Sequence, residues 1–217
     1  MNNKQTGPAP WANPTPAGLV ALGVACFLFF AYLTGRVGKI PGEYSAMPLM
    51  AAWLFGGFVV QIVVALCDLK SGNAPGGCTF LYFSAFFMLV GSLSFVVKSF
   101  VPGLDTRIEG YAWVVLSATV ILWAPAFYKG SSLLFISILS LCVACPLVAI
   151  CDLQILPAAT AAVCASVAGW SMLIGGISGI YLAAVLVVNG AYGREILPNP
   201  KSFYQEKDVP IGVAEVS

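Results

Sequence analysis

Long apolar stretches, separated by short polar breaks, organise the whole sequence. Six stretches stand out, at residues 17–34, 46–69, 78–97, 111–128, 132–153 and 158–189. Charged residues such as Arg36, Lys70 and Lys129 fall in the breaks. Most of the stretches are close to the roughly 20 residues that a helix needs to cross a bilayer. The pattern predicts six transmembrane helices.

A membrane-spanning barrel is excluded by the same pattern. Barrel strands alternate apolar and polar residues over about ten positions, whereas Phe27-Leu28-Phe29-Phe30 does not alternate. Helices also satisfy their own backbone groups, which irregular chain facing lipid cannot do. The last stretch, 158–189, is unusually long. It indicates a tilted helix or an irregular segment before the helix, and two short half-spans are the alternative.

Composition agrees with a chain that lives in lipid. The sequence is 59% hydrophobic and only 9% charged, whereas a soluble domain carries about 25% charged residues. We expect an all-α integral membrane protein surrounded by a lipid bilayer. Its organisation would be a polar tail over residues 1–15, a transmembrane domain over 16–190 and a second polar tail over 191–217. This leaves no room for a separate catalytic domain.

The inventory of reactive side chains argues against an enzyme. The sequence contains no His, which is the commonest general base and metal ligand. Cys142 and Cys145 have C-x-x-C spacing but lie inside an apolar stretch, where small packing residues are the favoured interpretation. Ten basic residues against nine acidic ones, with no basic run, do not indicate nucleic acid. We expect neither a cofactor nor a metal site.

The basic residues give a weak indication of orientation. Six spans place both termini on one side of the membrane. That side carries Lys4, Lys70, Lys129, Arg194, Lys201 and Lys207, and the other carries Arg36, Lys39, Lys98 and Arg107. Because basic loops favour the cytoplasmic side, both termini are expected to be cytoplasmic.

One short motif occurs twice. An Ala-x-Cys-Asp-Leu sequence ends the second stretch at residues 65–69 and the fifth stretch at residues 149–153. Equivalent positions in two three-helix halves would indicate a 3+3 inverted repeat, as found in many transporters. Chance similarity between apolar sequences is the other interpretation.

Polar residues within the spans are candidates for function because they are costly in lipid. Gln61 and Asp68 are seven residues apart and project from one helix face. In one interpretation, Gln61 joins two helices and Asp68 ends a helix near the headgroups. In the other, the two side chains form a polar track for a small solute. Asn13 and Pro14 precede the first span. They either start a helix or present its free N–H groups to a carboxylate.

A stripe of small residues runs along the last span. Gly175, Gly179 and Ala183 recur every four residues, which lets helix backbones approach closely. We expect this stripe to pack against another helix. The pattern leaves open whether that helix belongs to the same subunit.

Three segments together resemble the acetate uptake transporter family, also called the succinate–acetate permeases. The family's Asn-Pro-Ala-Pro-x-Gly-Leu signature is similar to residues 13–19, with Thr15 in place of Ala. Residues 56–73, with Gly-Gly, Gln61, Asp68 and Gly-Asn, resemble its second span and following loop. Residues 168–198 resemble its last span and tail. The resemblance runs from about Trp11 to Pro198.

The resemblance implies a hexamer of six-helix protomers, each with its own pore for acetate, related short monocarboxylates and, in some members, succinate. It implies a pore constriction made by an apolar ring at Leu22, Phe83 and Leu141. Further along the path, the residues expected to meet the substrate are Asn13, Pro14, Gln61, Asp68, Tyr82, Tyr181 and Asn189.

This chain departs from the family pattern at several positions. The family's typical Phe and Tyr in the ring are Leu22 and Phe83 here, so the ring loses a hydroxyl, with Tyr82 next to it. Leu186 stands where many members have Glu, and Asp68 where Glu is frequent. These positions bear on which acids can pass.

The leading hypothesis is a plasma-membrane permease for acetate and related monocarboxylates that works as a channel or as a proton-coupled symporter. A non-transporting membrane scaffold or sensor, and a channel for another small solute, are the alternatives. With charges mostly in loops, tails and span ends, we expect no buried Lys or Arg to hold a carboxylate. Binding should then be weak and passage quick.

Overall fold

The computed structural model describes residues 12–38, 45–101 and 103–204. Its helices in chain order are α1 (Thr15–Leu33), α2 (Met47–Lys70), α3 (Ala74–Tyr82), the π-helix η1 (Phe83–Leu89), α4 (Val90–Phe100), α5 (Arg107–Phe127), α6 (Ser132–Asp152) and α7 (Ala158–Tyr192). Because α3, η1 and α4 are continuous, they form one third span. Six helices among the described residues are long and apolar enough to cross a membrane. The predicted all-α fold with six spans is confirmed.

Two span boundaries differ from the sequence prediction. The third span runs from Ala74 to Phe100, rather than over residues 78–97. It starts earlier because the Asn73 side chain accepts a hydrogen bond from the Gly76 N–H at 3.2 Å and so caps the helix. The last span is one continuous helix of 35 residues that ends at Gly193 with φ 61°. The interpretation as two half-spans is therefore wrong.

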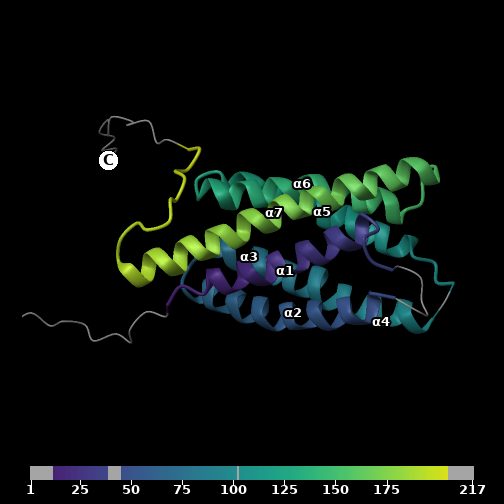
Figure 1. The fold of residues 1–217 in the computed structure, drawn as a ribbon, viewed down its shortest axis with the longest axis horizontal. Coiled ribbons are helices and arrows are strands. Elements are labelled where there is room, and N and C mark those ends of the chain that lie inside the picture. Colours follow the sequence, from purple (N-terminus) through teal and green to yellow (C-terminus); the bar gives the residue numbers. More distant parts are fainter. Residues whose placement is uncertain (1–11, 39–44, 102, 205–217) are drawn as a thin grey trace, which may run out of the picture.

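The spans pack side by side around a common axis (Figure 1). α1 lies between α2 and α7, and α6 lies between α5 and α7. α2 packs along the whole third span. Contact between the third span and α5 is much sparser and involves α3. The bundle therefore has one weak seam, between the third span and α5.

Small residues bring α1, α6 and α7 close together. A Cβ added at Gly23 of α1 would lie 2.5 Å from the Ile180 side chain, and one at Gly176 of α7 would lie 2.9 Å from Cys26. A Cβ at Gly175 would lie 3.2 Å from Ser140 of α6. The small-residue stripe of the last span thus packs within its own chain. This answers the question that the sequence left open.

Hydroxyl groups add hydrogen bonds between helices. Ser92 of α4 donates to the Ala51 carbonyl of α2 at 2.8 Å, and Ser137 of α6 donates to the Gly175 carbonyl of α7 at 3.0 Å. In lipid such bonds stabilise helix association because water does not compete for the same groups. They join helices on both sides of the axis.

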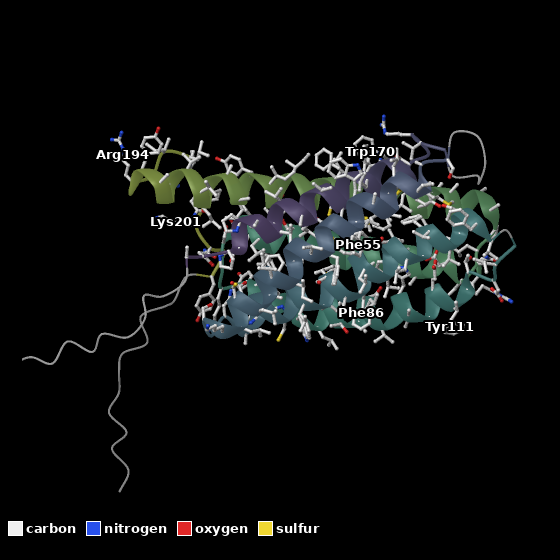
Figure 2. The ribbon with its side chains drawn as sticks, turned by 90° about the horizontal axis from the view of Figure 1, so that it is seen from below. Phe55, Phe86, Tyr111, Trp170, Arg194 and Lys201 are labelled. Atoms are coloured by element: carbon white, nitrogen blue, oxygen red, sulfur yellow. The ribbon has the colours of Figure 1, made fainter. Side chains whose placement is uncertain are left out.

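Large apolar side chains point outward over the bundle (Figure 2). Phe55, Phe86 and Trp170 are each about half exposed in the single chain. A soluble domain would bury such a continuous apolar surface. The outer face fits lipid or a neighbouring apolar surface.

The repeated Ala-x-Cys-Asp-Leu motif lies at opposite ends of the bundle. Asp68 accepts a hydrogen bond from Asn73 at 3.2 Å and another from Thr15 at the start of α1. Asp152 shares a cavity with Leu33 at the end of α1. An inverted repeat requires this antiparallel placement, and the repeat stays a prediction that agrees with it.

Gly110 provides a test of the packing between α5 and α6. A Cβ at Gly110 would lie 2.6 Å from the backbone nitrogen of Leu153, which cannot move aside as a flexible side chain can. We expect Gly110→Ala to cost about 1–3 kcal/mol by overpacking and to lower the unfolding midpoint in detergent. Gly56 is the matched helical control, because a Cβ there meets nothing within 4 Å. Equal midpoints for Gly110→Ala and Gly56→Ala would contradict the packing.

Candidate functional site

Two cavities lie along the axis, one towards each end of the bundle. The Thr15 cavity has a volume of about 200 Å³ and is lined by residues that include Thr15, Leu22, Asn73, Thr79, Phe83 and Ile138. The Lys98 cavity has a volume of about 380 Å³ and is lined by residues that include Phe29, Tyr82, Ser94, Lys98, Glu109 and Asp152. Both cavities are bounded by α1, the third span, α5 and α6. These four spans therefore surround the axis.

A packed apolar layer separates the two cavities. Leu22, Phe83 and Leu141 are at most 4% exposed and belong to one buried cluster. Phe87 continues this layer, with its ring centroid 5.7 Å from that of Phe83 and 4.8 Å from that of Phe29. The structure thus places the three residues expected at the constriction in one buried cluster, and Leu22 and Phe83 line the Thr15 cavity. Their role in limiting passage stays a prediction.

The π-helix positions the aromatic part of this layer. η1 covers Phe83–Leu89, and within it Phe83 and Phe87 are each 2% exposed. The wider turn of a π-helix shifts side-chain directions relative to an α-helix, and such segments are frequent at functional sites. Here Phe83 and Phe87 are both buried in the core cluster from one span. No sequence pattern indicated this change of helix type.

The Thr15 cavity has polar groups at the start of α1 and α3. Asn13 Oδ1 accepts a hydrogen bond from the Thr15 N–H at 3.0 Å, so Asn13 and Pro14 start the helix beside the cavity. Thr79 is 8% exposed, and its hydroxyl has no hydrogen-bond partner among the described residues. Sequence reasoning missed Thr79, although a lone Thr in an apolar span was a signal. The cavity thus offers an uncommitted buried hydroxyl.

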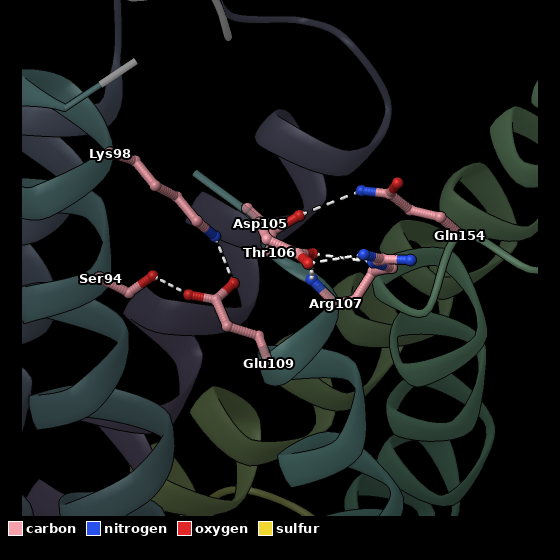
Figure 3. A network of polar contacts seen from close by, with 7 residues as sticks. All are labelled: Ser94, Lys98, Asp105, Thr106, Arg107, Glu109 and Gln154. Atoms are coloured by element: carbon pink, nitrogen blue, oxygen red, sulfur yellow. Dashed lines mark hydrogen bonds and ion pairs between the residues drawn. The ribbon is translucent and has the colours of Figure 1, made fainter. Parts of the chain in front are cut away.

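The Lys98 cavity contains a charged network (Figure 3). Lys98 of α4 makes an ion pair with Glu109 of α5, and Ser94 of α4 donates a hydrogen bond to the other oxygen of the same carboxylate. The Lys98 side chain is 23% exposed and the Glu109 side chain 28%. These groups therefore bridge the weak seam between the third span and α5.

Tyr82 and Asp152 complete the polar lining of this cavity. The Tyr82 hydroxyl donates to the Leu116 carbonyl of α5 at 2.6 Å, which is a third interaction across the seam. Tyr82 was expected on the path and does line this cavity. The cavity walls around these groups are aromatic, with Phe29, Phe95 and Trp113.

Comparison with known proteins places this arrangement in a family. No family model matches the chain. The succinate-acetate/proton symporter SatP of Escherichia coli (strain K12) is 30% identical over 192 residues, which cover 86% of this chain and 94% of that protein. The chain belongs to the acetate uptake transporter family.

A solved structure and one further protein are also similar to this chain. The solved structure of the bacterial acetate channel SatP matches with a TM-score of 0.73 and 26% identity, over 87% of this chain and 99% of that one. An uncharacterized protein from Methanothermobacter thermautotrophicus is 25% identical over 201 residues, or 86% of this chain and 90% of its own length. The full length of the bundle therefore has counterparts.

Gln61 and Asp68 of this acetate uptake transporter family member join helices. Gln61 is fully buried, and its amide donates to the Gly18 carbonyl of α1 at 3.2 Å. Its Oε1 has no partner among the described residues. Asp68 is 2% exposed and connects α2 to Asn73 and Thr15. Neither residue lines either of the two cavities, so the geometry favours the joining role.

Tyr181 and Asn189 lie outside both cavities as well. The Asn189 amide donates to the Leu197 carbonyl at 2.9 Å, and Asn189 Oδ1 accepts from the Ile196 and Leu197 N–H groups at 2.8 and 2.9 Å. The Tyr181 hydroxyl donates to the Pro198 carbonyl at 3.1 Å. The structure therefore uses these two residues to anchor the segment after α7 and does not bring them to the axis.

The expectation that no buried Lys or Arg would hold a carboxylate stays a prediction, because Lys98, which pairs with Glu109, is 23% exposed. Lys98 follows the apolar stretch in sequence, but α4 continues to Phe100 and carries Lys98 into the cavity. Ser94 and Lys98 are four residues apart and so share one helix face. That spacing was the signal that sequence reasoning overlooked.

The anchoring role of Asn189 can be tested directly. Asn189→Ala removes three hydrogen bonds that each contribute about 1 kcal/mol, so residues 193–204 should exchange amide hydrogens faster in mass spectrometry. Tyr181→Phe removes one bond and should have a smaller effect. Unchanged exchange in Asn189→Ala, combined with a changed acetate affinity, would favour the original path assignment.

Proposed function

We propose that the protein carries acetate and related short monocarboxylates, with succinate as a further substrate, across the membrane along the axis of each protomer. The observation that carries the proposal is the pair of axial cavities separated by an apolar layer at Leu22, Phe83 and Leu141. Membership of the acetate uptake transporter family supports it, through relatives named for succinate, acetate and proton transport.

The chemistry of the path suits a small carboxylic acid. An apolar ring fits the methyl group of acetate and excludes hydrated ions, since a dry constriction gates by dewetting. A carboxylic acid with a pKa of about 4 to 5 is partly neutral at mildly acidic pH. The neutral form crosses an apolar layer at a lower electrostatic cost. Uptake should therefore rise as the outside is acidified.

The setting that we propose is the plasma membrane, with both termini in the cytoplasm and a homo-hexamer as the assembly. Lys70, Lys129, Arg194 and Lys201 support this orientation, because basic residues favour the cytoplasmic side. Lys4, Lys39 and Lys207, also counted for orientation, lie outside the described residues. In this orientation the Lys98 cavity faces the outside. The exposed apolar side chains of the single chain support contact with lipid and with other subunits.

The proposal predicts flux of acetate in a purified system. Proteoliposomes that contain the protein should accumulate labelled acetate faster than empty liposomes. An inward proton gradient should increase the rate, and an uncoupler should remove that increase if transport is coupled to protons. Binding of acetate without flux would instead identify a sensor or scaffold. Competition by lactate, succinate and urea would rank the substrates.

The apolar layer should determine which acids pass. Leu141→Ala removes a fully buried side chain from α6, so the uptake of butyrate relative to acetate should rise about tenfold or more, a typical effect for pocket contacts of this size. Leu139→Ala is the matched control, because Leu139 is on the same helix and is 43% exposed. An unchanged ratio in Leu141→Ala would reject the constriction assignment.

A further inference from the structure

The donors in the Lys98 cavity already hold a carboxylate. Ser94 and Lys98 are one turn apart on α4, and each bonds to a different oxygen of the Glu109 carboxylate (Figure 3). A hydroxyl and an ammonium in this arrangement form a two-point clamp for a carboxylate group. Glu109 reaches the clamp from α5, across the weak seam.

The cavity itself has the properties of a ligand site. Its volume of about 380 Å³ falls in the range of about 300–1,000 Å³ that is usual for small-molecule pockets. Phe29, Phe95 and Trp113 provide apolar walls for the carbon skeleton of an acid. The clamp provides the few polar groups that such sites use for orientation.

The charges that face the clamp come from three elements. Lys98 of α4 is positive, whereas Glu109 of α5 and Asp152 of α6 are both acidic. With one cation and two carboxylates, the site has a formal charge of −1 when all three are ionised. Tyr32 of α1 and Tyr82 of α3 also line the cavity, as neutral phenols. A substrate anion is therefore repelled unless one of the two carboxylates moves away from Lys98.

We propose that the Lys98 cavity is a carboxylate-binding site in which the substrate exchanges with Glu109 for Ser94 and Lys98. This inference rests on the proposed function. Glu109 acts as an internal occupant that the substrate carboxylate displaces. Displacement also opens the ion pair that links α4 to α5, so substrate binding loosens the seam.

The exchange needs no covalent step. Lys98 stays charged, and the arriving anion takes the place of the Glu109 carboxylate beside the Lys98 ammonium and the Ser94 hydroxyl. The number of charges next to Lys98 is therefore the same before and after the exchange.

The test is the KM for acetate uptake into proteoliposomes at about pH 7.5, where free acetate is ionised. Lys98→Gln removes the cation and should raise the KM about tenfold or more, the loss typical of a hydrogen bond to a charged group. Glu109→Gln removes the competitor and should lower the KM.

The exposed pair Asp105 and Arg107 provides matched controls at the same end of the bundle (Figure 3). Arg107→Gln and Asp105→Asn change the charge by the same amounts as the two test variants, but neither residue lines the cavity. The Arg107 guanidinium lowers the pKa of Asp105 to about 2, so Asp105 is ionised at the pH of the assay. Both controls should keep the wild-type KM.

The outcomes separate the exchange from a purely structural ion pair. If Lys98 and Glu109 only hold α4 against α5, Lys98→Gln and Glu109→Gln should shift the KM in the same direction, and this result would overturn the inference. Opposite shifts, with the double variant behaving like Lys98→Gln, would support it. Should Lys98→Gln fail to fold in size-exclusion chromatography, Glu109→Gln decides: a lowered KM supports the exchange, and an unchanged or raised one overturns it. A wild-type protein without acetate uptake would instead reject the proposed function.

Discussion

Lipid offers no hydrogen bonds, and every other feature of this molecule depends on that constraint. Each span must satisfy its own backbone, which makes all six of them helices. Apolar side chains gain little by moving from lipid to a helix interface, so association relies on close contact and on bonds between helices. Gly23 and Gly176 bring α1 and α7 together, and Ser137 bonds α6 to α7. The tight half of the bundle is built in this way.

The junction between the third span and α5 is held together differently. The third span and α5 pack sparsely, and their junction holds the Lys98 cavity together with the ion pair between Lys98 and Glu109. Charged groups within a span are costly and persist where they are paired or reached by water. The seam meets both conditions, because the two side chains are paired and still partly exposed. In the exchange that we propose, it is the part of the bundle where the substrate acts on helix packing.

In the proposed function, the apolar layer and the polar cavities have different roles. Leu22, Phe83 and Leu141 belong to one buried apolar cluster, and we propose that a neutral or briefly dehydrated acid crosses it. The cavities at either end contain donors for a carboxylate, Thr79 on one side and Ser94 and Lys98 on the other.

The sequence by itself determined the solvent, the six helices and the family, because length and hydrophobicity are local properties that need no partner. Through a family resemblance, it also predicted a pore constriction at Leu22, Phe83 and Leu141. Only the tertiary structure decided which polar residues face the axis. Four residues expected on the path bond to neighbouring segments, while their contact with substrate stays a prediction: Gln61, Asp68, Tyr181 and Asn189. Lys98 looked like the end of a span but reaches a cavity. The difference arises because the sequence of a single helix shows that a polar group is costly in lipid. The partner that offsets this cost lies on another segment, and only the packing of the helices identifies it.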